Sequence, residues 1–239
     1  MNSIEILQEG SKELGLTLNE EQIDQFLKYK DLLIEWNEKM NLTAITDEKE
    51  VMIKHFLDSL CCMSLPFIKE NDKVIDVGTG AGFPGIPINI YYPNVNLTLL
   101  DSLNKRIKFL QEVCENVGLK AVDFEHGRAE DFGQNKNFRE KYDIVVARAV
   151  AQLNILCEYC LPFVRVGGYF ICQKGPNIDE EMKTAQKSIE VLGGKFVEKK
   201  DIKLPFSHIT HNIVVIEKIK KTPTKYPRKA GTPTKKPLI

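Results

Sequence analysis

The chain has 239 residues, of which 43% are hydrophobic and 28% are charged, as is ordinary for a soluble globular protein. It begins without a signal-peptide pattern and has no apolar run long enough to span a bilayer, so we expect a cytoplasmic protein that does not enter a membrane. The net charge of zero hides an asymmetry, because residues 218–239 hold eight Lys and Arg and no acid, which leaves −8 for residues 1–217.

Residues 1–70 have the spacing of a helical region. The pattern Thr17-Leu-Asn-Glu20 resembles a capping box and predicts the start of a helix in which apolar residues recur every three or four positions. A second capping pattern lies in Thr46-Asp-Glu-Lys-Glu-Val51 and predicts a helix that continues to Leu60, and Pro66 closes the region. We expect these residues to form a helical cap on the part that follows.

From residue 73 onward, short apolar runs alternate with stretches of helical spacing. This alternation predicts an α/β fold, with a mostly parallel sheet covered by helices on both faces. The last two extended runs have no helix between them and predict an antiparallel pair at the sheet edge. The predicted strands are Val74–Val77, Leu97–Leu100, Val122–His126, Ile144–Ala147, Tyr169–Cys172, Lys195–Leu204 and Asn212–Lys218. The predicted helices are Gly85–Tyr91, Asn104–Val117, Gln152–Leu161 and Asp179–Leu192.

The last twenty residues are rich in lysine and contain four prolines. A segment of this composition has little apolar surface to bury, so we expect an extended arm with little structure of its own. The predicted organisation is therefore a helical cap at residues 1–70, an α/β domain at residues 71–219 and a basic arm at residues 220–239.

The most informative stretch is the apolar run Val74–Val77 and the four glycines that follow it, at positions 78, 80, 82 and 85. A strand that passes through a glycine loop into a helix is typical of nucleotide-binding turns, because glycine reaches backbone angles closed to other residues and leaves room for a ligand. The last three glycines match the dinucleotide pattern G-x-G-x-x-G, which alone is a weak signal. Asp76 favours a different ligand, since a carboxylate repels a pyrophosphate and attracts the ammonium and sulfonium groups of S-adenosylmethionine (AdoMet).

Ligands of doubly wound sheets bind beyond the carboxyl ends of the strands, so the residues at those ends are candidates for the site. Asp101 directly follows the second strand and is predicted to accept the ribose hydroxyls, with a helix cap before Asn104 as the alternative. After the third strand, the amide of Ala129 and the carboxylate of Glu130 are placed to contact an adenine edge, although a solvated helix start has the same pattern. Arg148 directly follows the fourth strand, where it either pairs with an acid in the cleft or contacts a ligand.

Several segments, taken together in this order, carry a family resemblance. Over nearly its whole length the chain closely resembles the RsmG/GidB family of bacterial ribosomal RNA methyltransferases, and no departure from the family's pattern stands out. The matching segments are Trp36–Thr43, His55–Ser59, Asp76–Gly85, Leu100–Arg106, Gly127–Glu130, Ala147–Ala149, Lys174–Gly175 and Tyr226–Pro233.

The resemblance implies a Rossmann-like class I AdoMet-dependent methyltransferase fold, with a seven-stranded sheet and a helical amino-terminal extension. It also implies AdoMet as the cofactor and methylation of N7 of a guanine, guanine 527, in 16S rRNA. The family's AdoMet-binding positions fall on Gly78, Phe83, Ala129, Glu130 and Arg148, and the strand-end argument adds Asp101.

The motifs that are missing agree with this chemistry. Ala147-Arg-Ala-Val150 stands where amino-group methyltransferases carry Asp/Asn-Pro-Pro-Tyr or Phe, and no cysteine follows a proline, as the cytosine C5 enzymes require. Guanine N7 has a free lone pair and no proton to lose, so we assign no catalytic residue and treat His55 as structural. Cys157 and Cys160 have C-x-x-C spacing without a second pair, so we expect buried thiols and predict no metal site.

The basic residues are expected to hold the nucleic acid, in the form of small-subunit rRNA or a 30S particle, and nothing in the sequence requires more than a monomer. Two other functions stay open. One is an NAD-dependent dehydrogenase, from the G-x-G-x-x-G pattern and the acid downstream of it, and the other is a non-catalytic RNA-binding protein that uses the same basic arm. The predicted RNA contacts are Lys105, Arg106, Arg128, Lys174, Arg228 and Lys229.

Overall fold

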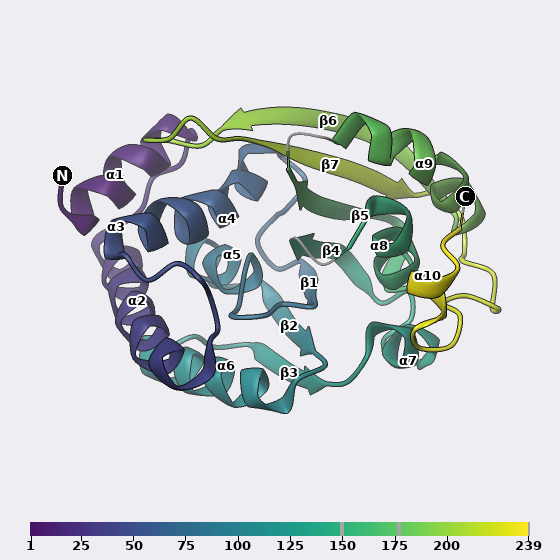
Figure 1. Ribbon diagram of the computed structural model, residues 1–239, viewed down its shortest axis with the longest axis horizontal. Helices are drawn as coiled ribbons and strands as arrows, with labels where there is room; N and C mark the ends of the chain where they lie inside the picture. The colour runs from purple at the N-terminus through teal and green to yellow at the C-terminus, as the bar shows by residue number, and fades with distance from the viewer. Residues whose placement is uncertain (149–150, 176–177, 239) are drawn as a thin grey trace.

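A seven-stranded sheet forms the centre of the molecule (Figure 1). The computed structural model describes residues 1–148, 151–175 and 178–238. Neighbouring strands from β3 to β5 pair in parallel, whereas β7 runs antiparallel to both β5 and β6. The predicted sheet with its antiparallel edge pair is confirmed. In spatial order the strands are β3 (Val122–His126), β2 (Asn96–Asp101), β1 (Lys73–Val77), β4 (Tyr142–Arg148), β5 (Val164–Lys174), β7 (Thr210–Lys218) and β6 (Gly194–Lys203).

Helices cover both faces of the sheet, as expected. Successive strand residues point to opposite faces, so Val74 belongs to the hydrophobic core of one face and Ile75 to that of the other. The first face carries α5 (Gly85–Tyr91) and α6 (Asn104–Val117), and the second carries α7 (Ala129–Gln134), α8 (Leu153–Cys160) and α9 (Ile178–Val191). Within the described ranges, no helix combines the length and the apolar character needed to cross a membrane.

The amino-terminal region is helical, but two of its helices begin at other residues than predicted. The capping box of α2 consists of Asn19 and Gln22, so Thr17 was the wrong cap, and α3 is capped by Asp47 and not by Thr46. Thr, Asn and Asp are all favourable N-caps, with Asn and Asp preferred to Thr, and here the preferred residue in each of the two patterns is the cap. The elements are α1 (Ser3–Glu13), α2 (Glu20–Met40), α3 (Glu48–Val51), a π-helix (Met52–Leu57), α4 (Asp58–Leu60) and a 3-10 turn (Cys61–Ser64).

These helices share one hydrophobic core with α5, α6 and the first face of the sheet. The division of the chain at residue 70 stays a prediction. All six cysteines are buried and free, and burial raises the pKa of Cys157 and Cys160 well above the usual thiol value. These two thiols are therefore part of the apolar core, as predicted.

The C-terminal segment, residues 219–238, is not the extended arm that the sequence predicted. It lies over α7 and α8 and contains a short helix, α10 (Thr232–Lys235) (Figure 1). The guanidinium of Arg139 donates hydrogen bonds to the carbonyl oxygens of Thr222 at 2.7 Å and Tyr226 at 2.8 Å. The prediction failed because composition does not show that the backbone carbonyl and N–H groups of this segment, together with Arg228, find partners on the rest of the protein.

Candidate functional site

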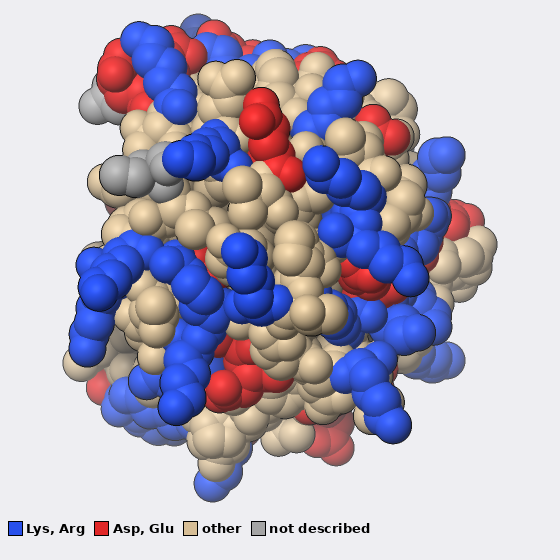
Figure 2. All heavy atoms as spheres, turned by 90° about the vertical axis from the view of Figure 1, so that its right-hand side faces the viewer, with Lys and Arg blue, Asp and Glu red and all other residues tan. Residues whose placement is uncertain are grey.

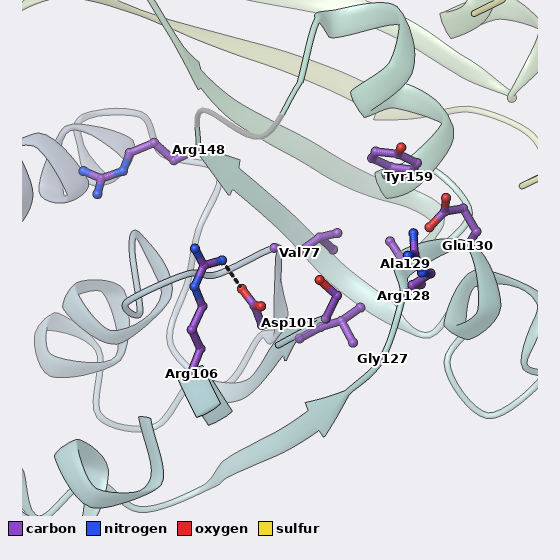
Figure 3. A pocket seen from close by; sticks show the side chains of 12 residues that line it. Val77, Asp101, Arg106, Gly127, Arg128, Ala129, Glu130, Arg148 and Tyr159 are labelled. Atoms are coloured by element: carbon purple, nitrogen blue, oxygen red, sulfur yellow. Dashed lines mark hydrogen bonds and ion pairs between the residues drawn. The ribbon is translucent and has the colours of Figure 1, made fainter. Parts of the chain in front are cut away.

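A cavity of about 380 Å³ opens beyond the carboxyl ends of β1, β2 and β4 and beside the start of α7 (Figure 3). Its volume lies within the range of small-molecule sites. Phe83 does not line this cavity and lies instead in an adjoining hollow above the glycine loop. The structure thus brings together five of the six predicted cofactor positions from separate parts of the chain, namely Gly78, Asp101, Ala129, Glu130 and Arg148.

The glycine loop between β1 and α5 forms one wall of the cavity. Gly78, Gly80 and Gly82 have φ angles of 71°, 63° and 100°, in the left-handed region that glycine adopts without strain. The N–H of Gly78 donates to the carbonyl oxygen of Leu100 at 2.9 Å, which ties the loop to the end of β2. These angles turn the chain sharply at the place where a ligand must approach the backbone.

Asp76 has a different place from the one predicted, because its side chain does not face the cavity. The residue is fully buried, and one carboxylate oxygen accepts hydrogen bonds from the hydroxyl of Thr79 at 2.7 Å and from the N–H of Gly85 at 2.8 Å. Burial raises the pKa of Asp76 to about 6. Asp76 therefore organises the glycine loop and occupies the N-terminus of α5 from inside the protein, so it does not attract a cation by direct contact.

Asp101 borders the cavity at the end of β2, with its side chain only 2% exposed. One carboxylate oxygen accepts from Nη1 of Arg106 at 3.2 Å (Figure 3) and from the N–H of Gly80 at 2.9 Å. The other accepts from the N–H of Leu103 at 2.9 Å. The alternative role of Asp101 as a helix cap is partly supported, because Leu103, whose N–H it accepts, is the residue directly before α6. Asp101 thus joins the glycine loop, β2 and the start of α6 at one point of the cavity wall.

The opposite end of the cavity is formed by α7 and α8. Ala129 is the first residue of α7, where backbone N–H groups have no partner within the helix. Glu130 is buried, and its Oε1 accepts a hydrogen bond from the N–H of Gly231 at 2.8 Å. The hydroxyl of Tyr159, on α8, lies 2.9 Å from Oγ1 of Thr234. Both side chains that close this end are therefore in contact with the C-terminal segment.

Arg148 points away from Glu130 and Tyr159, towards the amino-terminal helices (Figure 3). Its Nη1 donates to a carboxylate oxygen of Asp58 at 2.8 Å, and its guanidinium lies 4.8 Å from the centre of the Phe83 ring. Of the two roles that the sequence left open for Arg148, this geometry supports pairing with an acid. Arg148 still borders the cavity, so the second role stays a prediction.

His55 lies beside this ion pair, in the π-helix. Burial and the neighbouring Arg148 lower the pKa of His55 to about 4, so the ring is neutral at neutral pH. Because Nδ1 faces Nη2 of Arg148 at 3.3 Å and accepts from it, the ring proton lies on Nε2, which donates to Oγ1 of Thr43 at 2.8 Å. The ring also stacks on Phe83. These contacts fit the structural role expected of His55.

Three of the predicted RNA-binding residues, Lys105, Arg128 and Lys229, have exposed side chains near the cavity or on the C-terminal segment. Arg106 is partly exposed, and its charge is paired with Asp101. These four residues remain candidates for contact with a polyanion.

Lys174 and Arg228 are engaged within the protein, which argues against the RNA contacts predicted for them. Nζ of Lys174 lies 2.6 Å from a carboxylate oxygen of Glu181, and the Lys174 side chain is only 8% exposed. The guanidinium of Arg228 donates three hydrogen bonds, at 2.6, 2.9 and 3.2 Å, to the buried carboxylate of Glu158. The sequence showed their charge but could not show that Glu181 and Glu158 already pair with them.

Two residues of the site were missed by the sequence analysis. Tyr159 carried no local signal, because an aromatic residue in a helix usually belongs to the core. Asp58 lies in a segment that was noted only for its family resemblance. Ala149 and Val150, which belong to quoted motifs, lie outside the described residues. In the part of the chain that is described, no group of three or more His, Cys, Asp or Glu side chains is placed to hold a metal ion.

Comparison with known sequences gives matches over the whole chain. A family model described as rRNA small subunit methyltransferase G matches residues 22–210. A protein of that description from Alkaliphilus metalliredigens is 64% identical over 238 residues and covers 100% of both chains. Another, from Desulforamulus reducens, is 55% identical over 239 residues, also with 100% of both chains covered.

Solved structures agree with the architecture. The fibrillarin pre-rRNA processing protein of Methanococcus jannaschii has a TM-score of 0.53 at 21% identity, over 66% of this chain and 70% of that one. A mutant of MtNAS in complex with S-adenosylmethionine has a TM-score of 0.55 at 13% identity, over 82% of this chain and 72% of that one. At such identities the likeness concerns the fold alone.

Proposed function

The chain belongs to the rRNA small subunit methyltransferase G family, and we propose that it transfers a methyl group from AdoMet to N7 of guanine 527 in 16S rRNA. The observation that carries the proposal is the cavity at the strand ends, where the glycine loop, Asp101 and Glu130 converge. The identity of the guanine rests on the family resemblance alone.

The residues around the cavity suit AdoMet. The carboxylate of Asp101 has about four acceptor positions and uses three, one of them for the partly exposed Arg106, so it can accept from a ribose hydroxyl. The N–H of Ala129 and the carboxylate of Glu130 supply a donor and an acceptor for an adenine edge. Gly78 and Arg148 also line the cavity and would then face the methionine part of AdoMet.

The dinucleotide alternative is disfavoured by the N-terminus of α5. A dinucleotide loop places a pyrophosphate at this point, because the helix N-terminus attracts anions. Here the carboxylate of Asp76 already accepts the N–H of Gly85. A Cβ at Gly85 would lie 2.8 Å from that same carboxylate, so the helix start and Asp76 are packed directly against each other. A pyrophosphate would have to displace a buried anion or lie beside it.

For this reaction the protein has to do little more than orient AdoMet and the guanine relative to each other. AdoMet, when bound, supplies an electrophilic methyl group on its sulfonium. Guanine N7 offers a lone pair and carries no proton, so no side chain has to act as a general base. Well-oriented intramolecular reactions reach effective molarities of about 10⁵–10⁸ M, so holding the two partners in line accounts for most of the rate. The polar residues around the cavity would then serve to bind and orient.

The exposed basic residues supply a surface for the RNA. Figure 2 shows Lys and Arg side chains gathered on the side of the molecule where the C-terminal segment lies. If about four phosphates are contacted, the slope of log affinity against log salt concentration should be about −3 for a single-stranded segment. The exposed lysines on the segment are Lys220, Lys221, Lys225, Lys229, Lys235 and Lys236.

The test is methyl transfer to defined rRNA. Purified protein is incubated with labelled AdoMet and 16S rRNA, either free or in 30S particles, and the methylated nucleotide is mapped by mass spectrometry. We expect one 7-methylguanine, which should also be missing from rRNA of cells that lack the protein. AdoMet binding without transfer to competent substrate would support a non-catalytic RNA-binding protein. Tight binding of NADH without AdoMet binding would favour the dehydrogenase.

We further propose that the enzyme works as a monomer in the cytoplasm. A ribosomal RNA substrate and six free cysteines both suit that compartment. Light scattering of the purified protein, alone and with the RNA, tests the monomer.

A further inference from the structure

The C-terminal segment is held against the protein by contacts spread along most of its length. Near its start, Arg139 binds the carbonyl oxygens of Thr222 and Tyr226. Further on, Nε2 of Gln134 donates to the carbonyl oxygen of Pro227 at 2.8 Å. Tyr226 itself is 7% exposed and belongs to the hydrophobic core of α7 and α8. A segment with these contacts has a defined position relative to both helices.

An ion pair fixes the middle of the segment next to the cavity. Glu158 lies on α8, and its carboxylate is 1% exposed. The carboxylate accepts hydrogen bonds from the backbone N–H of Arg228 at 2.8 Å and from the guanidinium of the same residue. Tyr159, which lines the cavity, is the next residue on α8. The pair therefore holds the segment at the helix turn that carries a cavity residue.

Two bonds then connect the segment to the cavity wall itself. The N–H of Gly231 donates to Oε1 of Glu130, and Thr234 bonds the hydroxyl of Tyr159. Both Glu130 and Tyr159 line the cavity at the end assigned to adenine. Without the segment, a buried carboxylate oxygen would lose the charge-assisted donor identified here, and the Tyr159 hydroxyl would lose a partner.

The donor to Glu130 depends on the backbone conformation of Gly231. This residue has φ of +79°, and no other atom lies within 4 Å of the position of an added Cβ. A side chain would therefore meet no clash, but it would strain the left-handed backbone that directs the N–H at Glu130. The need for glycine at position 231 is therefore explained by the backbone angle that directs its N–H at Glu130.

The outer surface of the segment differs from its inner surface because it carries exposed lysines. Its lysine side chains are exposed, and the basic side chain that points inward, Arg228, is the one paired with Glu158. The inner surface thus holds the cavity wall while the outer surface carries charge. Removing the whole segment would change both properties at once, so only single substitutions can separate them.

We propose that the C-terminal segment is a positioning element of the cofactor cavity, which holds Glu130 and Tyr159 in place for the adenosine end of AdoMet even when no RNA is bound. The inference rests on the proposed function, because that function identifies AdoMet as the occupant of the cavity. Gly231 and Thr234 are positioning residues in this account, since they act through Glu130 and Tyr159.

The experiment uses the full chain and measures AdoMet affinity by calorimetric titration in the absence of RNA. Gly231→Ala should weaken AdoMet binding roughly tenfold, as expected for loss of a hydrogen bond to a charged group. Thr234→Val, an exposed and milder change, should weaken it about twofold to fivefold. Lys236→Ala, at an exposed position two residues further on, is the matched control and should bind AdoMet like the wild type.

Steady-state kinetics separate positioning from general stabilisation. KM for AdoMet should be higher in Gly231→Ala and in Thr234→Val than in the wild type. In both variants, kcat at saturating AdoMet and KM for the RNA should be unchanged. A lower melting temperature with unchanged AdoMet affinity would overturn the inference, because the segment would then stabilise the fold only. A raised KM for RNA with unchanged AdoMet affinity would also overturn it.

AdoMet binding by the wild type distinguishes a failure of this inference from a failure of the proposed function. If the wild type binds AdoMet and both variants bind it equally well, only the inference fails. If the wild type binds no AdoMet, the proposed function fails and the inference fails with it.

Discussion

The amino-terminal helices and the C-terminal segment contact opposite ends of the same cavity, and they do so by different means. At one end, the carboxylate of Asp58 binds the guanidinium of Arg148. At the other end, the N–H of Gly231 and the hydroxyl of Thr234 bind Glu130 and Tyr159. The first contact is between two charged side chains, whereas the second combines a bond from a backbone N–H with a bond between two hydroxyls, and both of these depend on where the C-terminal segment is docked.

This difference predicts how each end responds to mutation. A side-chain ion pair is lost when one partner is changed. The protein is then destabilised, because the remaining charge is left without a partner. A backbone contact survives most substitutions in the segment and is lost only when the segment moves or its backbone angle changes. The C-terminal end should therefore be sensitive at a few docking residues and tolerant elsewhere.

The largest effect is expected from Arg228→Ala, which leaves the carboxylate of Glu158 buried with its main charged partner removed. Breaking one side of a buried ion pair costs about 3–5 kcal/mol, and the expected loss lies near the lower figure because the N–H of residue 228 still reaches Glu158. Denaturant unfolding measures it, with Lys229→Ala as the control, expected within about 0.5 kcal/mol of wild type. Equal stability of the two variants would show that the segment is not docked through this pair.

A smaller loss, about 2 kcal/mol, is expected for Asp58→Asn at the other end of the cavity, because a charged hydrogen bond to Arg148 is replaced by a neutral one. In the wild type, the carboxylate of Asp58 faces Nδ1 of His211 and raises the pKa of that histidine. Asp58→Asn removes this carboxylate. Unfolding at neutral pH gives the stability, and histidine NMR titration should show the His211 pKa falling. An unchanged pKa would mean that Asp58 does not bind His211 in solution.

The pH dependence of stability tests the neutral state of His55. Its pKa in the folded protein is about 4, below the value of about 6.5 of an unperturbed histidine. The stability it contributes is therefore present above pH 6.5 and is lost as the pH falls towards 4, which amounts to about 1–2 kcal/mol between pH 7 and pH 5. His55→Gln should remove that part of the pH dependence. If both proteins lose the same stability over this range, His55 is not held neutral.

The smallest effect on stability, within about 0.5 kcal/mol, is expected from the double change Lys235→Ala and Lys236→Ala on the outer surface of the C-terminal segment. The effect should appear in RNA binding, where each lost phosphate contact lowers the salt slope by about 0.7. Filter binding at several salt concentrations measures it. An unchanged slope would remove these two lysines from the RNA-binding surface.

The sequence predicted the sheet and most of the cavity because the signals for them are local. Apolar runs mark buried strands, and the glycine loop and Asp101 lie at strand ends that a parallel sheet brings to one edge. The docking of the C-terminal segment was not predictable in this way. It depends on Glu158 and Arg139, which are distant in the chain and look like ordinary surface charges in the sequence.

Asp76 shows a second limit of the sequence argument. The argument that its carboxylate repels a pyrophosphate still applies, but the expectation that it attracts a cationic ligand by direct contact was wrong. A sequence shows that a carboxylate is near a loop and does not show whether the carboxylate faces outwards or accepts the N–H groups of the loop itself, as Asp76 does.

The most direct test of the account is a crystal structure of the full chain with AdoMet bound. We expect the adenine beside Ala129 and Glu130, a ribose hydroxyl on Asp101, and the C-terminal segment docked with the N–H of Gly231 on Glu130. AdoMet bound elsewhere, or a cavity that holds a diphosphate at the glycine loop in its place, would contradict the account.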